Sequence, residues 1–131
     1  MDAATRQLVG DRASWRCEYC HLPQAAIELT FHVEHIVAKQ HGGDDSPDNL
    51  GLSCDRCNFL KGPNLSSIDH STRVIVTLFP PRRLSWDDHF KLQGIDIVGQ
   101  TPAGRATVEL LKMNASRRRE LRAQLLTVGE F

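Results

Sequence analysis

The sequence has no long apolar segment, and this absence excludes one class of protein. None of its apolar runs approaches the roughly 20 residues that a membrane-spanning helix needs. The first residues also lack the apolar stretch of a secretory signal peptide. We therefore expect a cytoplasmic protein that has no membrane partner.

The sequence also has no internal repeat and no low-complexity linker. Its 131 residues fall within the usual size of one domain, so we expect residues 1–131 to fold as a single domain. A hydrophobic content of 40% with 24% charged residues is ordinary for a globular protein. A core of this size is modest and would gain from a metal or disulfide staple.

Cysteine is scarce, and all four residues occur in two Cys-x-x-Cys pairs, Cys17 with Cys20 and Cys54 with Cys57. The two-residue spacing lets both thiolates of a pair bind one ion, and four thiolates complete a tetrahedral zinc site. A reducing compartment favours metal over disulfides. A redox-active pair or four free thiols would not explain two matched pairs. We expect a structural zinc ion, because a site with four protein ligands has no open position for catalysis.

Turn residues and hydrophobic periodicity predict an α+β protein made of short elements. Helices are expected over 3–16, from the second cysteine pair to Gly62-Pro63, over 101–113 and over 115–127, with one helical turn after Ser85. Strands are expected over 27–37, 50–53, 73–79 and 95–98, and a loop over 40–49.

A carboxylate and an imidazole stand side by side at Glu34 and His35, and an amide follows the second cysteine pair at Asn58. Hydrolysis of a phosphodiester needs a base that takes a proton from water and a cation that stabilises charge on the phosphate. His35 has the intrinsic pKa of such a base. Glu34 and Asn58 offer the hard oxygen ligands that suit Mg²⁺ or Mn²⁺. These residues therefore predict a second, open metal site.

The combination resembles the HNH endonuclease motif, and the similarity covers about residues 14–62. It is carried by the segment FHVEHIVAKQHGGDDSPDNLGLSCDRCNFLKG, in which an acidic-His pair precedes Gly-Gly, Asn-Leu, Cys-x-x-Cys-Asn and Lys. The resemblance implies a ββα-metal, treble-clef-like fold stapled by zinc. It implies that Glu34 and Asn58 bind the catalytic ion, that His35 is the general base, and that Asn49 braces the loop and orients the base. Many family members have Asp at the position of Glu34, so the ion would sit slightly differently here.

Beyond this HNH core, residues 63–131 are expected to form a C-terminal α/β extension. It resembles extensions of small bacterial HNH proteins and adds little about the substrate. Net charge is zero, but residues 1–60 hold five Lys and Arg against nine Asp and Glu, and residues 61–131 hold eleven against seven. The basic excess is greatest at Arg117, Arg118, Arg119 and Arg122. These arginines either contact phosphate or form a solvated helix face.

Four further residues are weaker candidates. On a regular strand His32 shares the face of Glu34, where it would contact metal or phosphate unless it is a surface or packed histidine. Lys61 shares a helix face with Asn58 and either contacts phosphate or is solvated. Arg82 and Arg83 either clamp DNA or form a surface pair.

Two functions from different classes follow from these residues. The first is a metal-dependent endonuclease that hydrolyses DNA, and the second is a non-catalytic, zinc-stapled module that binds nucleic acid. Fold alone does not separate them. Glu34, His35 and Asn58 together favour the enzyme, because a pure binding module needs none of the three.

Overall fold

The computed structural model describes residues 1–131 as five α-helices, three short 3₁₀ helices (Gln24–Ala26, Lys39–His41 and Pro47–Asn49) and six strands. The helices are α1 (Ala3–Arg12), α2 (Asp55–Lys61), α3 (Trp86–His89), α4 (Pro102–Leu110) and α5 (Ser116–Thr127). The strands are β1 (His32–His35), β2 (Leu50–Ser53), β3 (Ser66–Asp69), β4 (Val74–Thr77), β5 (Phe90–Gln93) and β6 (Asp96–Gly99). Each strand pairs antiparallel with its neighbour in the sequence, which gives three separate two-stranded sheets. The fold class is α+β, as the sequence predicts.

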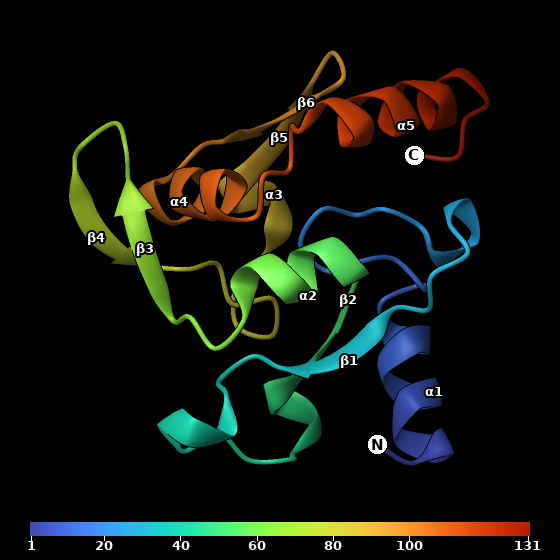
Figure 1. The fold of residues 1–131 in the computed structure, drawn as a ribbon, viewed down its shortest axis with the longest axis vertical. Helices are drawn as coiled ribbons and strands as arrows, with labels where there is room; N and C mark the ends of the chain where they lie inside the picture. The colour runs from blue at the N-terminus through green and yellow to red at the C-terminus, as the bar shows by residue number, and fades with distance from the viewer.

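The N-terminal half contains a ββα unit made of β1, β2 and α2 (Figure 1). In the β1–β2 hairpin Glu34 lies opposite Gly51 and His35 lies opposite Leu50. Helix α2 packs against both strands, and α1 packs against β2. All four residues of β2 are buried. This is the ββα arrangement that the HNH resemblance implies.

Local capping fixes the ends of α2. The Sγ atom of Cys54 accepts a hydrogen bond from the Cys57 backbone N–H at 3.4 Å, so a cysteine acts as the N-cap. At the other end Gly62 has a φ of +50°, a conformation that glycine adopts readily, and Pro63 cannot continue the helix. The predicted start and end of this helix are therefore confirmed.

The predicted strand over 27–37 is wrong in its length, because only His32–His35 are extended and paired. The Gln24 side chain explains the difference. Its amide donates to the Leu29 carbonyl at 2.9 Å and accepts from the Phe31 N–H at 2.6 Å. This side chain folds the preceding residues into a turn and uses backbone groups that a longer strand would need.

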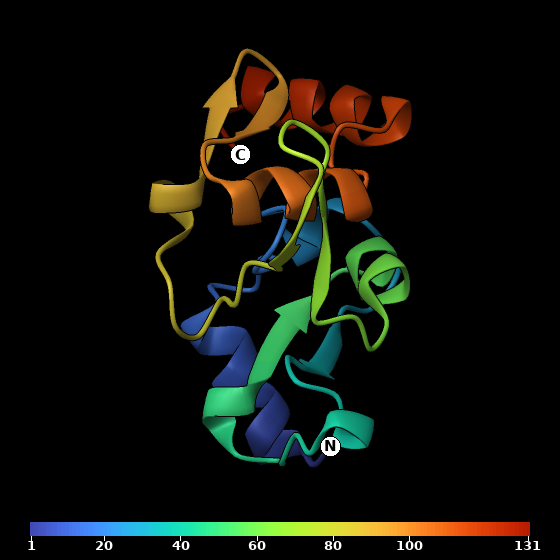
Figure 2. The same cartoon turned by 90° about the vertical axis from the view of Figure 1, so that its left-hand side faces the viewer.

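The C-terminal extension contains two hairpins, β3–β4 and β5–β6, with α4 packed against β3, β4 and β6. Figures 1 and 2 show this extension stacked on one end of the ββα unit, with α5 and the β5–β6 hairpin at the end away from α1. The sequence did not predict β3 or β5. It also predicted α1 and α4 too long, since α1 ends at Arg12 and α4 at Leu110.

One cluster of 17 buried residues joins the two halves of the chain. It includes Val9 of α1, Leu52 of β2, Phe79 after β4 and Leu125 of α5, together with all four cysteines. None of the five helices has both the length and the apolar character that crossing a bilayer requires.

Candidate active site and metal centres

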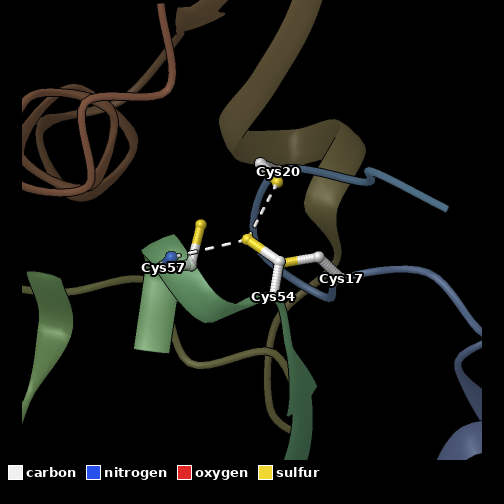
Figure 3. Close-up of side chains that lie close together, drawn as sticks. All are labelled: Cys17, Cys20, Cys54 and Cys57. Atoms are coloured by element: carbon white, nitrogen blue, oxygen red, sulfur yellow. Dashed lines mark hydrogen bonds between the residues drawn. The ribbon is translucent and has the colours of Figure 1, made fainter. Parts of the chain in front are cut away.

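The four cysteines form one buried cluster, whose sulfur atoms all lie within 4.8 Å of one another. Cys17 and Cys20 come from the loop that follows α1, and Cys54 and Cys57 come from the junction of β2 and α2 (Figure 3). The Sγ atoms of Cys20 and Cys54 are 3.8 Å apart. Four sulfurs at about 2.3 Å from a tetrahedral zinc ion would be separated by about 3.8 Å. The cluster therefore fits a structural zinc ion.

Burial and the neighbouring sulfur atoms raise the pKa of the Cys17 thiol well above its ordinary value. Four thiolates packed this closely need a cation among them, and a divalent ion supplies the charge. A second positive charge near the cysteine sulfurs comes from outside the two Cys-x-x-Cys pairs. Arg118 of α5 places Nη2 3.9 Å from Cys54 Sγ and 3.4 Å from Asp55 Oδ1. The C-terminal helix thus contacts the cysteine cluster directly.

A separate cleft of about 400 Å³ lies between β1, the residues that follow it and the C-terminal end of α2. Its walls contain the residues that sequence analysis assigned to the open site. The nine lining residues are His32, Val33, Glu34, His35, Ala38, Lys39, Asn58, Gly62 and Pro63. The ββα unit therefore brings the Glu34-His35 pair and Asn58 to one cavity, as their predicted roles require.

Glu34 is only 7% exposed, and its two carboxylate oxygens have different surroundings. Oε2 lies 3.8 Å from the Lys61 ammonium group, whereas Oε1 has no hydrogen-bond partner. Burial raises the pKa of Glu34, and the charge of Lys61 opposes this effect. A buried carboxylate oxygen without a partner is costly unless something binds it. The Glu34 carboxylate, which the Tyr19 hydroxyl also approaches, and the Asn58 amide line the same cleft, so they offer oxygen ligands that fit a divalent ion.

His35 is held by an aspartate from the loop that sequence analysis did not single out. Its Nε2 lies 2.7 Å from Asp45 Oδ1, and Lys39 Nζ lies 3.3 Å from Asp45 Oδ2. A carboxylate accepts hydrogen bonds, so Nε2 carries the hydrogen in this contact, and in the neutral form of the ring Nδ1 has the lone pair. The loop contains Asp44 and Asp45 in succession, and the sequence has no signal that distinguishes the one that contacts the base.

Asn49 braces the loop between β1 and β2. Its Oδ1 accepts from the Val37 N–H at 2.9 Å, and its Nδ2 donates to the carbonyl oxygens of Val37 at 3.0 Å and Asp44 at 2.8 Å. The loop is tight here, since a Cβ on Gly43 would lie 1.7 Å from the Val37 carbonyl oxygen. The Gly-Gly sequence and the asparagine therefore act together to hold the chain that follows His35.

Of the two weaker candidates His32 and Lys61, only His32 lies at the surface of this cleft. His32 is exposed and lines the cleft with Glu34. Lys61 faces the interior at 2% exposure, where Nζ donates to the Ile36 carbonyl at 3.0 Å. Lys61 also lines a second, larger cavity of about 760 Å³, together with Asn49, Arg82 and Arg83. The Lys61 ammonium group lies 3.8 Å from Glu34 Oε2, where it compensates the charge of the buried carboxylate.

Several basic residues of the extension make contacts within the protein, whereas Arg83 is exposed. Arg82 forms an ion pair with Glu18, whose carboxylate also accepts from the Leu52 N–H at 2.7 Å. On α5, Arg119 pairs with Asp96 and Arg122 is 3% exposed, with its guanidinium on the carbonyls of Ile95 and Met113. The sequence suggests that these arginines either contact phosphate or form a solvated helix face. Neither alternative describes Arg118, Arg119 and Arg122, which join α5 to neighbouring parts of the protein. Arg117 alone of the four is exposed.

Tyr19 is another buried residue of the site that the sequence did not indicate. Its side chain is fully buried, and its hydroxyl has no hydrogen-bond partner. Burial raises the pKa of Tyr19 well above its ordinary value, and the charge of Glu34 adds to this effect. Tyr19 lies between Cys17 and Cys20 in the sequence, and this position is the one signal that could have placed it close to the metal centres.

Comparison with known proteins agrees with this geometry. The family model described as HNH endonuclease matches residues 17–64. No curated protein and no solved structure matches the chain. The matched segment contains both cysteine pairs, the cleft residues and Asn49, so this part of the chain is similar to HNH endonuclease domains. The similarity points to a nuclease or a protein that binds nucleic acid.

Proposed function

We propose that this protein is a metal-dependent endonuclease that hydrolyses phosphodiester bonds in DNA. The observation that carries the proposal is the single cleft lined by Glu34, His35 and Asn58, with an unpartnered Glu34 oxygen in its wall. A structural zinc site beside it would hold the ββα unit in shape. A pure binding module has no need for a buried carboxylate, an imidazole and an amide around one cleft.

In this mechanism Glu34 and Asn58 would hold the divalent ion through oxygen atoms, and His32 is a further candidate at the rim of the same cleft. A bound Mg²⁺ or Mn²⁺ would supply positive charge for the phosphate and for the leaving oxygen. The charge of Lys61 favours the ionised form of the Glu34 carboxylate, because it opposes the effect of burial on the pKa of Glu34.

His35 would take a proton from the attacking water at Nδ1, the ring nitrogen that Asp45 does not hold. The Asp45 carboxylate would stabilise the imidazolium that forms, since it lies 2.7 Å from Nε2. Asn49 would keep the loop and the base in place through its three hydrogen bonds to Val37 and Asp44. In this proposal His35 is the base, Asp45 stabilises its charged form and Asn49 holds the loop.

Cleavage of supercoiled plasmid DNA tests the proposal. The zinc-loaded protein should convert it to nicked or linear forms with Mg²⁺ or Mn²⁺ and leave it intact with EDTA. His35→Ala should lower the rate by about 10²- to 10⁴-fold, the usual contribution of a general base. His70→Ala is the matched control, because His70 is an exposed histidine outside the cleft. A His35→Ala protein that cuts at the wild-type rate would exclude His35 as the base.

A metal titration tests the ligands separately from the base. Glu34→Ala and Asn58→Ala should each raise the Mg²⁺ or Mn²⁺ concentration needed for half-maximal cleavage, or abolish cleavage, while zinc content stays at one ion per chain. Asn64→Ala is the control for Asn58→Ala, because Asn64 is exposed and does not line this cleft. Identical metal curves for all these proteins would place the ion elsewhere. Nucleic-acid binding without cleavage under any divalent ion would favour the binding module instead.

A further inference from the structure

Phe59 is the most exposed of the large hydrophobic residues, at 80% exposure. It lies on α2, whose opposite face is buried through Cys57 and Lys61, each 2% exposed. Exposure of a large aromatic ring to water is unfavourable, and this ring adds nothing to the core. A binding role is a physical reason for an aromatic residue at such a position.

The position of Phe59 on α2 connects it to the cleft. It directly follows Asn58 and lies three residues before Gly62, and both of these residues line the cleft. Consecutive residues of a helix point about 100° apart around its axis, so the aromatic side chain lies on the face of α2 next to the one that carries Asn58. Space around Gly62 is open, since a Cβ there would meet only the Phe59 carbonyl oxygen, at 3.9 Å.

A positive charge stands on the same side of the helix. Arg56 precedes Phe59 by three residues, so the two side chains are neighbours on α2. Arg56 forms no ion pair with any carboxylate of the chain, in contrast to Arg82, Arg105, Arg118 and Arg119. Its charge is therefore free for an external anion. An aromatic ring beside a free cation is the combination by which proteins bind unpaired nucleotides, through base stacking and phosphate contact.

We propose that Phe59 stacks on an unpaired nucleobase next to the phosphodiester in the cleft, and that Arg56 contacts a neighbouring phosphate. This inference rests on the proposed function and adds a substrate class to it. Bases of an intact duplex are paired and stacked on each other, and exposing the face of one costs a few kcal/mol. The protein should therefore prefer single strands, or duplexes with an unpaired base, over intact duplex.

Binding without cleavage tests the stacking role. The zinc-loaded full chain is titrated, with no added divalent ion, into a fluorescent single-stranded oligonucleotide and into the matching duplex. Phe59→Ala should weaken single-strand binding by roughly 5- to 150-fold, the range expected for loss of one stacked base, and should affect intact duplex much less. Phe59→Leu should behave like Phe59→Ala, because it keeps apolar surface and loses the aromatic face. Ile75→Ala is the control, an exposed apolar residue on β4 at 71% exposure.

A Phe59→Trp variant gives a direct readout of stacking. It should retain single-strand affinity, and its additional indole emission should fall on saturation with the oligonucleotide. Unchanged affinity in both Phe59→Ala and Phe59→Leu, or indole emission that the oligonucleotide does not alter, would overturn the inference even if plasmid cleavage is normal. Phe59-dependent binding in a protein that never cleaves would support the inference while excluding the hydrolytic function.

Discussion

Lys61 Nζ lies 3.8 Å from Glu34 Oε2 in the interior of the ββα unit, with the two side chains only 3% and 6% exposed. The ammonium group also donates to the Ile36 carbonyl, directly after β1. A lysine near the end of α2 thus joins the helix to the strand that holds the proposed metal ligand. Breaking a buried ion pair from one side leaves a buried charge without compensation.

Lys61→Met should therefore lower the free energy of unfolding by about 3–5 kcal/mol, because the Glu34 carboxylate loses its partner. Urea unfolding of the zinc-loaded protein measures this. Lys39→Met is the control, because Lys39 is exposed and its surface ion pair with Asp45 should contribute no more than about 1 kcal/mol. The double variant Lys61→Met with Glu34→Gln should recover part of the loss. Equal stability of Lys61→Met and Lys39→Met would contradict a structural pair.

Removal of zinc should unfold the domain, because the cysteine cluster belongs to the only large hydrophobic cluster of the chain. Structural zinc contributes apparent free energies of about 10–16 kcal/mol in small domains, as much as a typical domain's whole stability of about 5–15 kcal/mol. Elemental analysis should find one zinc per chain, and Cys17→Ser or Cys54→Ser should give unfolded or aggregated protein. Retention of the native circular dichroism spectrum after complete zinc loss would argue against this role.

Arg118 should slow the release of zinc, because its guanidinium lies 3.9 Å from Cys54 Sγ and pairs with Asp55. Loss of an outer contact to a metal ligand typically weakens metal affinity by about 10- to 100-fold. Arg118→Met should therefore release zinc faster to a chromogenic chelator. Arg117→Met is the matched control, since Arg117 is the exposed neighbour on the same helix. Equal release rates from the two variants would show that α5 does not stabilise the metal centre.

Local signals in the sequence predict the parts of the ββα unit that depend on neighbouring residues. The strand Leu50–Ser53 is predicted at its observed bounds, since a loop rich in Gly, Asp and Pro precedes it and a cysteine N-cap follows it. The end of α2 follows from Gly62-Pro63. The cleft itself is predicted because the motif fixes both the residue types and the ββα fold that brings them together.

The parts that the sequence does not predict depend on contacts between distant residues. Strand β3 has the sequence Ser-Ser-Ile-Asp, which has little strand preference, and it is extended because it pairs with β4 and packs on α4. The α5 arginines resemble a solvated face in sequence, yet Arg118 meets Asp55 across 63 positions of the chain. No local pattern indicates such a partner. The contact between His35 and Asp45 depends likewise on the fold of the braced loop.

The extension contains an ion pair between Arg105 and the buried Asp69, and this pair should make stability depend on pH. Arg105 donates to both oxygens of Asp69, at 3.0 and 2.8 Å, and these bonds lower the pKa of Asp69 to about 2. The unfolded chain has an Asp pKa of about 3.9. Since the folded pKa is the lower one, the carboxylate stabilises the fold above about pH 4, and this contribution is lost as the pH falls towards 2.

The measurement is the stability difference between wild type and Asp69→Asn at several pH values from 5 down to 2. The difference should be constant near pH 5 and shrink towards pH 2, because protonation of Asp69 makes the two proteins alike. The comparison uses only those pH values at which both proteins keep their zinc, because loss of zinc should unfold the domain. A difference that does not change with pH would mean that Asp69 keeps an ordinary pKa.

Asn49→Ala should loosen the loop that follows His35 without unfolding the domain. The variant loses three hydrogen bonds, two of them to the peptide groups of Val37, while the backbone bond from Ile36 N–H to the residue 49 carbonyl remains. Amide hydrogen exchange at Val37 should become faster, and the cleavage rate should fall because the base is no longer held in position. Asn64→Ala, at an exposed asparagine outside this loop, should change neither quantity. A normal cleavage rate combined with fast exchange at Val37 would show that the loop can move without displacing His35, and Asn49 would then stabilise the fold alone.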